Sequence, residues 1–184
     1  MIGAILGDIV GAPYEFDNRK SKDFPLFDPH TLYTDDTVMT VAVADALLGW
    51  DGKDVASFKE HLVDKMHEWG RVVPDAGYGG RFLTWVLSDS RQPYGSYGNG
   101  SAMRVSPVAW YADSLEETLA LACASAEVTH NHPEGVKGAE AVAGAIFLAR
   151  TGKDKDAIRT FLSNYYRLDF TLDEIRADYD FDET

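Results

Sequence analysis

The chain has 184 residues, 45% of them hydrophobic, which suits a single globular domain over residues 1–184 that buries its own core. Its formal net charge of −13 argues against a nucleic-acid groove, because no stripe of Lys and Arg is available to neutralise a phosphate backbone. The single cysteine, Cys123, excludes an internal disulfide and a cysteine-based zinc site.

The first predicted element is a helix over residues 2–12, in which Gly3, Gly7 and Gly11 recur every four residues. Glycines at this spacing form a line along one face of a helix, where another backbone can approach closely. Because glycine is a poor helix former, we expect tight burial of this face to offset the loss of helix stability. A buried Asp8 in this helix must find donors or a cation. The segment is too short to span a bilayer and lacks a basic leader, so the sequence predicts no membrane span and a cytoplasmic location.

The rest of the chain also favours helices. No alternation of apolar and polar residues indicates a strand, and no repeat of fixed period is present, so the predicted fold class is all-α. Apolar residues at spacings of three and four predict helices over residues 36–49, 54–69, 82–87, 101–111, 115–127, 133–150 and 155–166.

The segment Thr34-Asp35-Asp36-Thr37 is a candidate metal site. It places two hydroxyls and two carboxylates at the mouth of a predicted helix, and oxygen ligands of this kind suit Mg²⁺, Mn²⁺ or Ca²⁺. The alternative is a helix cap, because Thr is favoured at the N-cap and acidic residues in the first turn. These residues alone leave the two interpretations balanced.

Two further acidic residues are candidates for catalysis. Glu15 follows Pro13-Tyr14 at the end of the first predicted helix, where a carboxylate can act in a cleft; taken alone, it is better explained as a solvated acid. Asp75 lies in a glycine-rich loop and is a candidate general base, with turn formation as the stronger alternative.

A glycine-rich loop and a histidine are candidates for binding phosphate. The loop Gly95-Ser96-Tyr97-Gly98-Asn99-Gly100-Ser101 precedes a predicted helix, an arrangement that can cradle an anion, although an exposed turn has the same composition. His130 and His132 lack the further ligands of a zinc site, and one of them lining a pocket is the better interpretation.

Four motifs in this order resemble the ADP-ribosylglycohydrolase family, which includes dinitrogen reductase-activating glycohydrolases and ADP-ribosyl-acceptor hydrolases. The resemblance covers essentially the whole chain. The motifs are Gly7-Asp8-Ile9-Val10-Gly11-Ala12-Pro13-Tyr14-Glu15, Tyr33-Thr34-Asp35-Asp36-Thr37-Val38-Met39-Thr40, Gly95-Ser96-Tyr97-Gly98-Asn99-Gly100-Ser101-Ala102-Met103-Arg104 and Thr129-His130.

The resemblance implies a compact multi-helix fold with two divalent cations, Mg²⁺ or Mn²⁺, beside the glycosidic bond of an ADP-ribosyl group. By this resemblance Thr34, Asp35 and Asp36 are metal ligands, and Glu15 and Asp75 are carboxylates near the reacting bond. The segment from Gly95 to Ser101 would hold the diphosphate, with His130 lining the pocket nearby.

The family also carries a Gly-Asp-x-Asp-Thr-type motif near its C-terminus that completes the metal pair, and nothing after His132 resembles it. We therefore expect a C-terminally incomplete fold, an impaired metal site, and self-association through the surface that the absent segment leaves open. The expected function is removal of ADP-ribose from a protein or small molecule, and the alternative is a non-catalytic module that binds ADP-ribose or a nucleotide.

Overall fold

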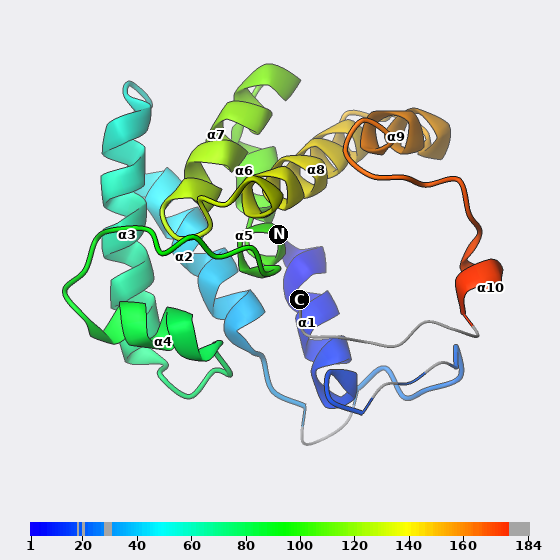
Figure 1. Cartoon of the computed structure of the whole chain (residues 1–184), viewed down its shortest axis with the longest axis horizontal. Helices are drawn as coiled ribbons and strands as arrows, with labels where there is room; N and C mark the ends of the chain where they lie inside the picture. Colours follow the sequence, from blue (N-terminus) through cyan, green and yellow to red (C-terminus); the bar gives the residue numbers. More distant parts are fainter. Residues whose placement is uncertain (18, 20, 28–30, 177–184) are drawn as a thin grey trace.

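The computed structural model describes residues 1–17, 19, 21–27 and 31–176, and these form helices and loops without a strand (Figure 1). The all-α prediction is confirmed. The helices are α1 (Ile2–Gly11), the 3-10 helix η1 (Ala12–Tyr14), α2 (Asp35–Gly49), α3 (Val55–Val72), α4 (Gly80–Leu87), α5 (Gly100–Met103), α6 (Ser106–Tyr111), α7 (Leu115–Glu127), α8 (Pro133–Arg150), α9 (Lys155–Leu162) and α10 (Leu172–Ile175).

Helix α2 lies in the middle of the fold, in contact with α1, α3, α5 and α6, while α7 packs along α8 (Figure 1). Its apolar side chains, such as Met39, Val43 and Leu47, are buried in a hydrophobic cluster that includes residues of α3, α4, α6, α7 and α8. Because apolar residues occur around most of its circumference, α2 behaves as a core helix.

Side-chain caps fix where several helices begin. The side chain of Asp54 accepts hydrogen bonds from the backbone N–H groups of the first turn of α3, and that of Ser114 does the same for α7. The ring of His132 accepts a bond from the backbone N–H of Glu134, so this histidine caps α8. Each cap satisfies an N–H group that the helix itself leaves without a partner.

The prediction of one continuous helix over residues 101–111 is wrong. The chain turns at Arg104 and Val105 and forms two short helices, α5 and α6. Pro107 lies in the first turn of α6. Proline has no N–H and its ring clashes with the preceding turn, so it is tolerated at a helix start and not in the interior. The helix predicted over residues 155–166 is shorter, ending at Leu162.

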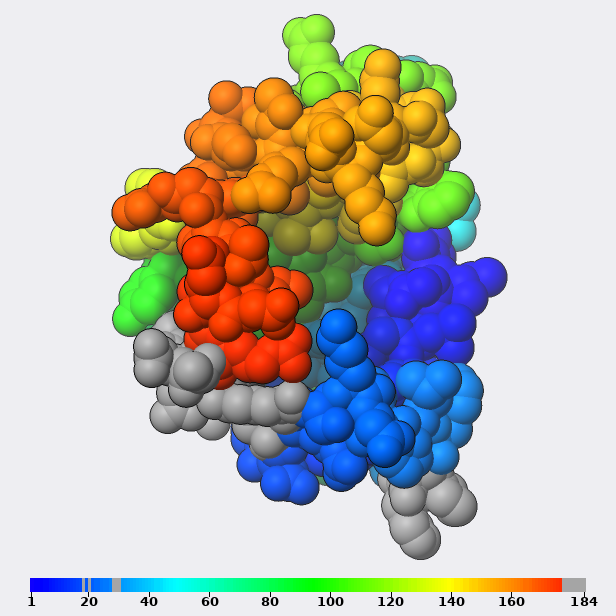
Figure 2. Space-filling model, turned by 90° about the vertical axis from the view of Figure 1, so that its right-hand side faces the viewer, coloured from blue at the N-terminus to red at the C-terminus, as the bar shows by residue number. Residues whose placement is uncertain are grey.

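The expectation of tight burial along the glycine line of α1 is also wrong. Gly3, Gly7 and Gly11 are exposed, and a Cβ atom built on any of them would meet nothing within 4 Å. The only buried residue of α1 is Asp8. Figure 2 shows α1 in blue on the surface, separated by a hollow from the C-terminal segment in red. Spacing predicted the helix, but it did not reveal which face of the helix is covered.

No helix in the described part of the chain is both long enough and apolar enough to cross a bilayer.

Gly70 and Gly7 give a matched test of this packing. A Cβ atom at Gly70 in α3 would lie 2.7 Å from Cγ1 of Val86, so Gly70→Ala should lower the free energy of unfolding by about 1–3 kcal/mol through overpacking. Gly7→Ala meets open space and should raise it by about 0.5–1 kcal/mol, because alanine is the better helix former. Urea denaturation of both variants measures the two effects, and equal shifts of the same sign would contradict this difference in packing between α1 and α3.

Candidate functional site

The site begins with the buried carboxylate of Asp8, which joins α1 to the start of α2. Asp8 accepts hydrogen bonds from the backbone N–H of Thr34 at 2.9 Å and from the Thr34 hydroxyl at 2.7 Å. It also accepts from the backbone N–H and the hydroxyl of Thr37. Four donors satisfy a carboxylate that would otherwise be costly to bury. The prediction that a buried Asp8 finds donors or a cation is confirmed for the donors.

Thr34 is the N-cap of α2, because its hydroxyl oxygen accepts a hydrogen bond from the backbone N–H of Asp36. The backbone N–H of Asp35 donates to the carbonyl of Ala76 at 2.8 Å, which fastens the loop after α3 to the same place. The cap interpretation is therefore confirmed. It does not exclude a metal site, because a hydroxyl oxygen that donates one bond and accepts one still has a lone pair.

Like charges crowd the start of α2. Burial, followed by the charges of Asp36, Glu15 and Asp8, raises the pKa of Asp35 to about 7 from an ordinary value of 3.8. Burial, followed by the charges of Asp8 and Glu15, raises the pKa of Asp36 to about 6. Both carboxyl groups therefore resist ionisation, and a cation between them would relieve the repulsion.

The donor set fits part of a hard-cation site. Asp35 and Asp36 offer carboxylates and Thr34 a hydroxyl oxygen, and all three are half-buried at one helix start. However, no group of three or more His, Cys, Asp and Glu side chains in the described residues is arranged to hold a metal ion. A divalent cation bound here would need further oxygen ligands, such as water or substrate hydroxyls.

The two other acidic candidates differ in their relation to this cluster. Glu15 is exposed, yet its charge raises the pKa of both Asp35 and Asp36, which places it near them. Asp75 is exposed in a turn and does not contribute to either shift, so the structure does not bring it into the cluster. The loop containing Asp75 supplies Tyr78 instead, which is buried and whose pKa is raised to about 12 by burial, Asp35 and Tyr33.

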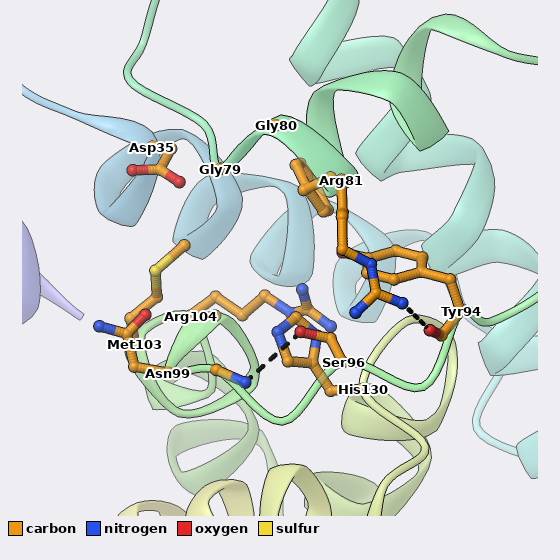
Figure 3. A pocket seen from close by; sticks show the side chains of 13 residues that line it. Asp35, Gly79, Gly80, Arg81, Tyr94, Ser96, Asn99, Met103, Arg104 and His130 are labelled. Carbon is orange, nitrogen blue, oxygen red and sulfur yellow. Dashed lines mark hydrogen bonds between the residues drawn. The ribbon is translucent and has the colours of Figure 1, made fainter. Parts of the chain in front are cut away.

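A cavity of about 280 Å³ extends from Asp35 at the start of α2 to the glycine-rich loop and His130 (Figure 3). It is near the lower end of the range for small-molecule pockets, roughly 300–1,000 Å³, and can hold part of a nucleotide-sized ligand. Its lining consists of Asp35, Gly79, Gly80, Arg81, Phe82, Tyr94, Ser96, Gly98, Asn99, Gly100, Met103, Arg104 and His130.

The predicted phosphate loop contributes only part of its length to this lining. Ser96, Gly98, Asn99 and Gly100 line the cavity. Tyr97 is exposed and its ring lies 5.4 Å from that of His132.

The two ends of the loop anchor it to α8 and the turn before α8. The backbone N–H of Gly95 donates to Oδ1 of Asn131 at 2.8 Å. The Ser101 side chain is buried, and its hydroxyl donates to the carbonyl of Gly135 at 2.7 Å. The predicted helix N-terminus is weaker than expected because α5, from Gly100 to Met103, has only four residues.

His130 lies in the cavity wall, packed against the loop. A Cβ atom at Gly100 would lie 2.9 Å from both Nε2 and Cε1 of His130, so the ring occupies the space that any larger residue would need. Burial, followed by the charges of Arg104 and Arg81, lowers the pKa of His130 to about 3. The imidazole is therefore neutral at physiological pH.

Sequence reasoning missed Arg81, Tyr94 and Arg104 as cavity residues. The Arg81 guanidinium donates to the carbonyl of Tyr94 and lies 4.9 Å from the centre of the Tyr94 ring. In an acidic chain, an arginine directly after Gly79-Gly80 is a signal that could have indicated an anion site. Arg104 ends the third family motif, but its position near His130 depends on tertiary packing and was not visible in the sequence.

The family model for ADP-ribosylglycohydrolase matches residues 1–183. The chain belongs to the ADP-ribosylglycohydrolase family. It is 33% identical to ADP-ribosylhydrolase ARH3 of Mus musculus over 185 residues, which cover 83% of this chain and 48% of that protein. It is 31% identical to ADP-ribosylhydrolase ARH3 of Homo sapiens over 186 residues, covering 83% and 49%.

A bacterial relative is the ADP-ribosylarginine hydrolase Tri1 of Pseudomonas putida (strain GB-1), 29% identical over 178 residues, which cover 85% of this chain and 47% of that protein. This member of the ADP-ribosylglycohydrolase family thus spans about half the length of the curated relatives it matches.

The carboxylate cluster of this family member predicts an unusual dependence of stability on pH. Between pH 4 and 7 the unfolded chain releases the Asp35 proton whereas the folded chain retains it, so the free energy of unfolding falls as pH rises through this window. Asp35→Asn removes the titrating group. In the presence of a chelator, its melting temperature should exceed that of the wild type by on the order of 2–4 °C above pH 7, and the difference should vanish near pH 4.

Thermal melts at several pH values measure this difference. Asp51→Asn, at an exposed carboxyl group in the loop after α2, is the control and should leave the pH profile unchanged. A difference between Asp35→Asn and wild type that stays constant with pH would contradict the electrostatic account.

Proposed function

We propose that this chain carries the ADP-ribose site of a metal-dependent hydrolase that cleaves the glycosidic bond between ADP-ribose and an acceptor. The observation that carries the proposal is the cavity between α2 and the glycine-rich loop. Asp35 lies on one side of it, and Arg81 and His130 lie on another (Figure 3). A ligand in which an uncharged sugar is followed by a diphosphate, as in ADP-ribose, matches this separation of charge. Family membership and the names of the relatives support the same class of reaction.

In this proposal Thr34, Asp35 and Asp36 hold Mg²⁺ or Mn²⁺ through oxygen ligands. When bound, such cations orient the ribose hydroxyls and neutralise negative charge that develops during cleavage. Asp8 holds the Thr34 hydroxyl in a fixed direction by accepting a hydrogen bond from it. The raised pKa values of Asp35 and Asp36 support the proposal, because the cluster lacks the positive charge that a cation would supply.

Glu15 is proposed to act near the scissile bond. Its charge reaches both aspartates, and a carboxylate in this place can stabilise the oxocarbenium-like charge on the anomeric carbon or accept a proton from attacking water. Asp75 is retained as a weaker candidate, because its exposed turn position would require the loop to move toward the cavity.

The diphosphate is proposed to bind along Ser96, Gly98, Asn99 and Gly100, where small residues allow the backbone to come close to a ligand. Arg81 and Arg104 provide positive charge in this wall of the cavity. Local charge of this kind lets an acidic protein bind an anion, because solvent screens its distant surface carboxylates.

Release of ADP-ribose from an ADP-ribosylated protein or small molecule tests the proposal. With Mg²⁺ or Mn²⁺ present, Asp36→Asn should lower the rate at least about a hundredfold, since losing a cation ligand removes several kcal/mol of transition-state stabilisation. Asp51→Asn should retain the wild-type rate. Release that is unaffected by Asp36→Asn and by a chelator would contradict the metal-dependent reaction.

A second candidate function is a module that binds ADP-ribose without cleaving it. One observation favours it: the described residues assemble the loop and His130 into a cavity, but they do not assemble three acidic or histidine ligands for a metal. Calorimetry with ADP-ribose separates the two functions, because a chain that binds ADP-ribose but does not release it from an ADP-ribosylated substrate is a binding module. A chain that neither binds ADP-ribose nor releases it would contradict both. The cytoplasmic location and the self-association stay predictions.

A further inference from the structure

Arg104 is the largest fully buried side chain in the described part of the chain. Its Nη2 atom donates to the carbonyl of Ser125 at 2.9 Å and to Oγ1 of Thr129 at 2.8 Å. Its Nε and Nη1 atoms have no hydrogen-bond partner among the described residues, and no ion pair with a described carboxylate is formed. Burial lowers its pKa only to about 10, so it remains a cation. A buried cation without an anionic partner costs stability, which suggests a role other than holding the fold together.

The bond to Thr129 continues to His130. Oγ1 of Thr129 lies 2.8 Å from Nδ1 of His130, and the Thr129 side chain is fully buried. A guanidinium can only donate, so the Thr129 oxygen accepts from Arg104. The Thr129 proton then needs an acceptor, and within the described residues Nδ1 of His130 is the acceptor in reach. A ring nitrogen that accepts carries no proton, which leaves the proton of a neutral imidazole on Nε2.

Nε2 is the ring nitrogen on the edge of His130 that faces the glycine-rich loop, together with Cε1. It lies beside Gly100, where a Cβ atom would approach it to 2.9 Å, and both residues line the cavity. Figure 3 shows the Arg104 side chain extending toward the His130 ring. An N–H group here can donate to an anionic oxygen in the cavity, whereas an unprotonated Nε2 would repel it.

We infer that Arg104 is a positioning residue that acts through Thr129 to hold His130 as the Nε2–H tautomer, which donates a hydrogen bond to a phosphate oxygen of the ligand beside Gly100. The ring stays neutral because burial and the nearby Arg104 and Arg81 disfavour a second proton. The identity of the ligand, a diphosphate-containing nucleotide, rests on the proposed function. The tautomer does not, because it follows from bonds within the chain alone.

The tautomer can be observed without any ligand. Two-bond ¹H–¹⁵N correlations of histidine-labelled wild-type chain, with the His130→Gln variant to identify the signal, should show a proton on Nε2 and none on Nδ1. A proton on Nδ1, or on both nitrogens, at neutral pH would overturn the inference even if the Thr129 and Arg104 variants failed to fold.

Two substitutions at Thr129 link the tautomer to binding. Thr129→Val keeps the shape of the side chain and removes its hydroxyl, so His130 should become a mixture of the Nε2–H and Nδ1–H tautomers. The Kd for ADP-ribose should then rise about tenfold, which corresponds to the loss of one hydrogen bond to a charged group. Thr129→Ser keeps the hydroxyl and should retain both the tautomer and the affinity. If Thr129 had only a structural role, replacing it with Val would leave the tautomer of His130 unchanged.

Arg104→Met provides a second route, and it should weaken ADP-ribose binding at least as much as Thr129→Val, since it removes the charge as well as the bond. Unchanged tautomer and affinity in Thr129→Val, or unchanged affinity in Arg104→Met, would contradict the inference. A wild-type chain that shows the Nε2–H tautomer but does not bind ADP-ribose would contradict the proposed function and leave the positioning of His130 intact.

Discussion

The arrangement of the site depends on the buried carboxylate of Asp8. Helix α1 contributes no fully buried apolar side chain, and its one buried residue, Asp8, joins it to α2 by accepting hydrogen bonds from Thr34 and Thr37. Hydrogen bonds to a charged acceptor are stronger than neutral ones, and each of these also satisfies a group at the start of a helix. The same contact brings Glu15, at the end of η1, toward the aspartates of α2. This polar contact therefore brings Asp8 and Glu15 toward the two neighbouring aspartates at the start of α2.

The other wall of the cavity is held by close packing. Gly135 in α8 leaves room for the backbone of His130 and Ser96, each of which would lie 2.9 Å from a Cβ atom at that position. Gly100 leaves room for the His130 ring in the same way. Because these contacts tolerate no added atom, the loop and the ring have little freedom, and a ligand would meet a surface that is already organised. The cavity thus combines a wall fixed by hydrogen bonds with a wall fixed by glycine contacts.

The sequence predicted most helices because their signals are local. Apolar spacing and the capping residues Asp54 and Ser114 lie within a few positions of the helix that they define. The acidic cluster was also visible, since Asp35 and Asp36 are adjacent. Tertiary relations were not visible. Spacing revealed neither that the glycine face of α1 is open nor that Arg104 lies beside Thr129, because a periodic pattern says that a face exists and not what covers it.

The distribution of charge in the cavity also constrains the direction in which a ligand can bind. At the α2 wall, Asp35 and its acidic neighbours repel an anion unless a cation stands between them. At the opposite wall, Arg81 and the buried Arg104 attract one. A ligand in which an uncharged sugar is followed by a diphosphate is therefore favoured with its sugar toward α2 and disfavoured in the reverse orientation. An orientation set in this way by the two walls of the cavity needs no contact with a group attached to the far side of the sugar.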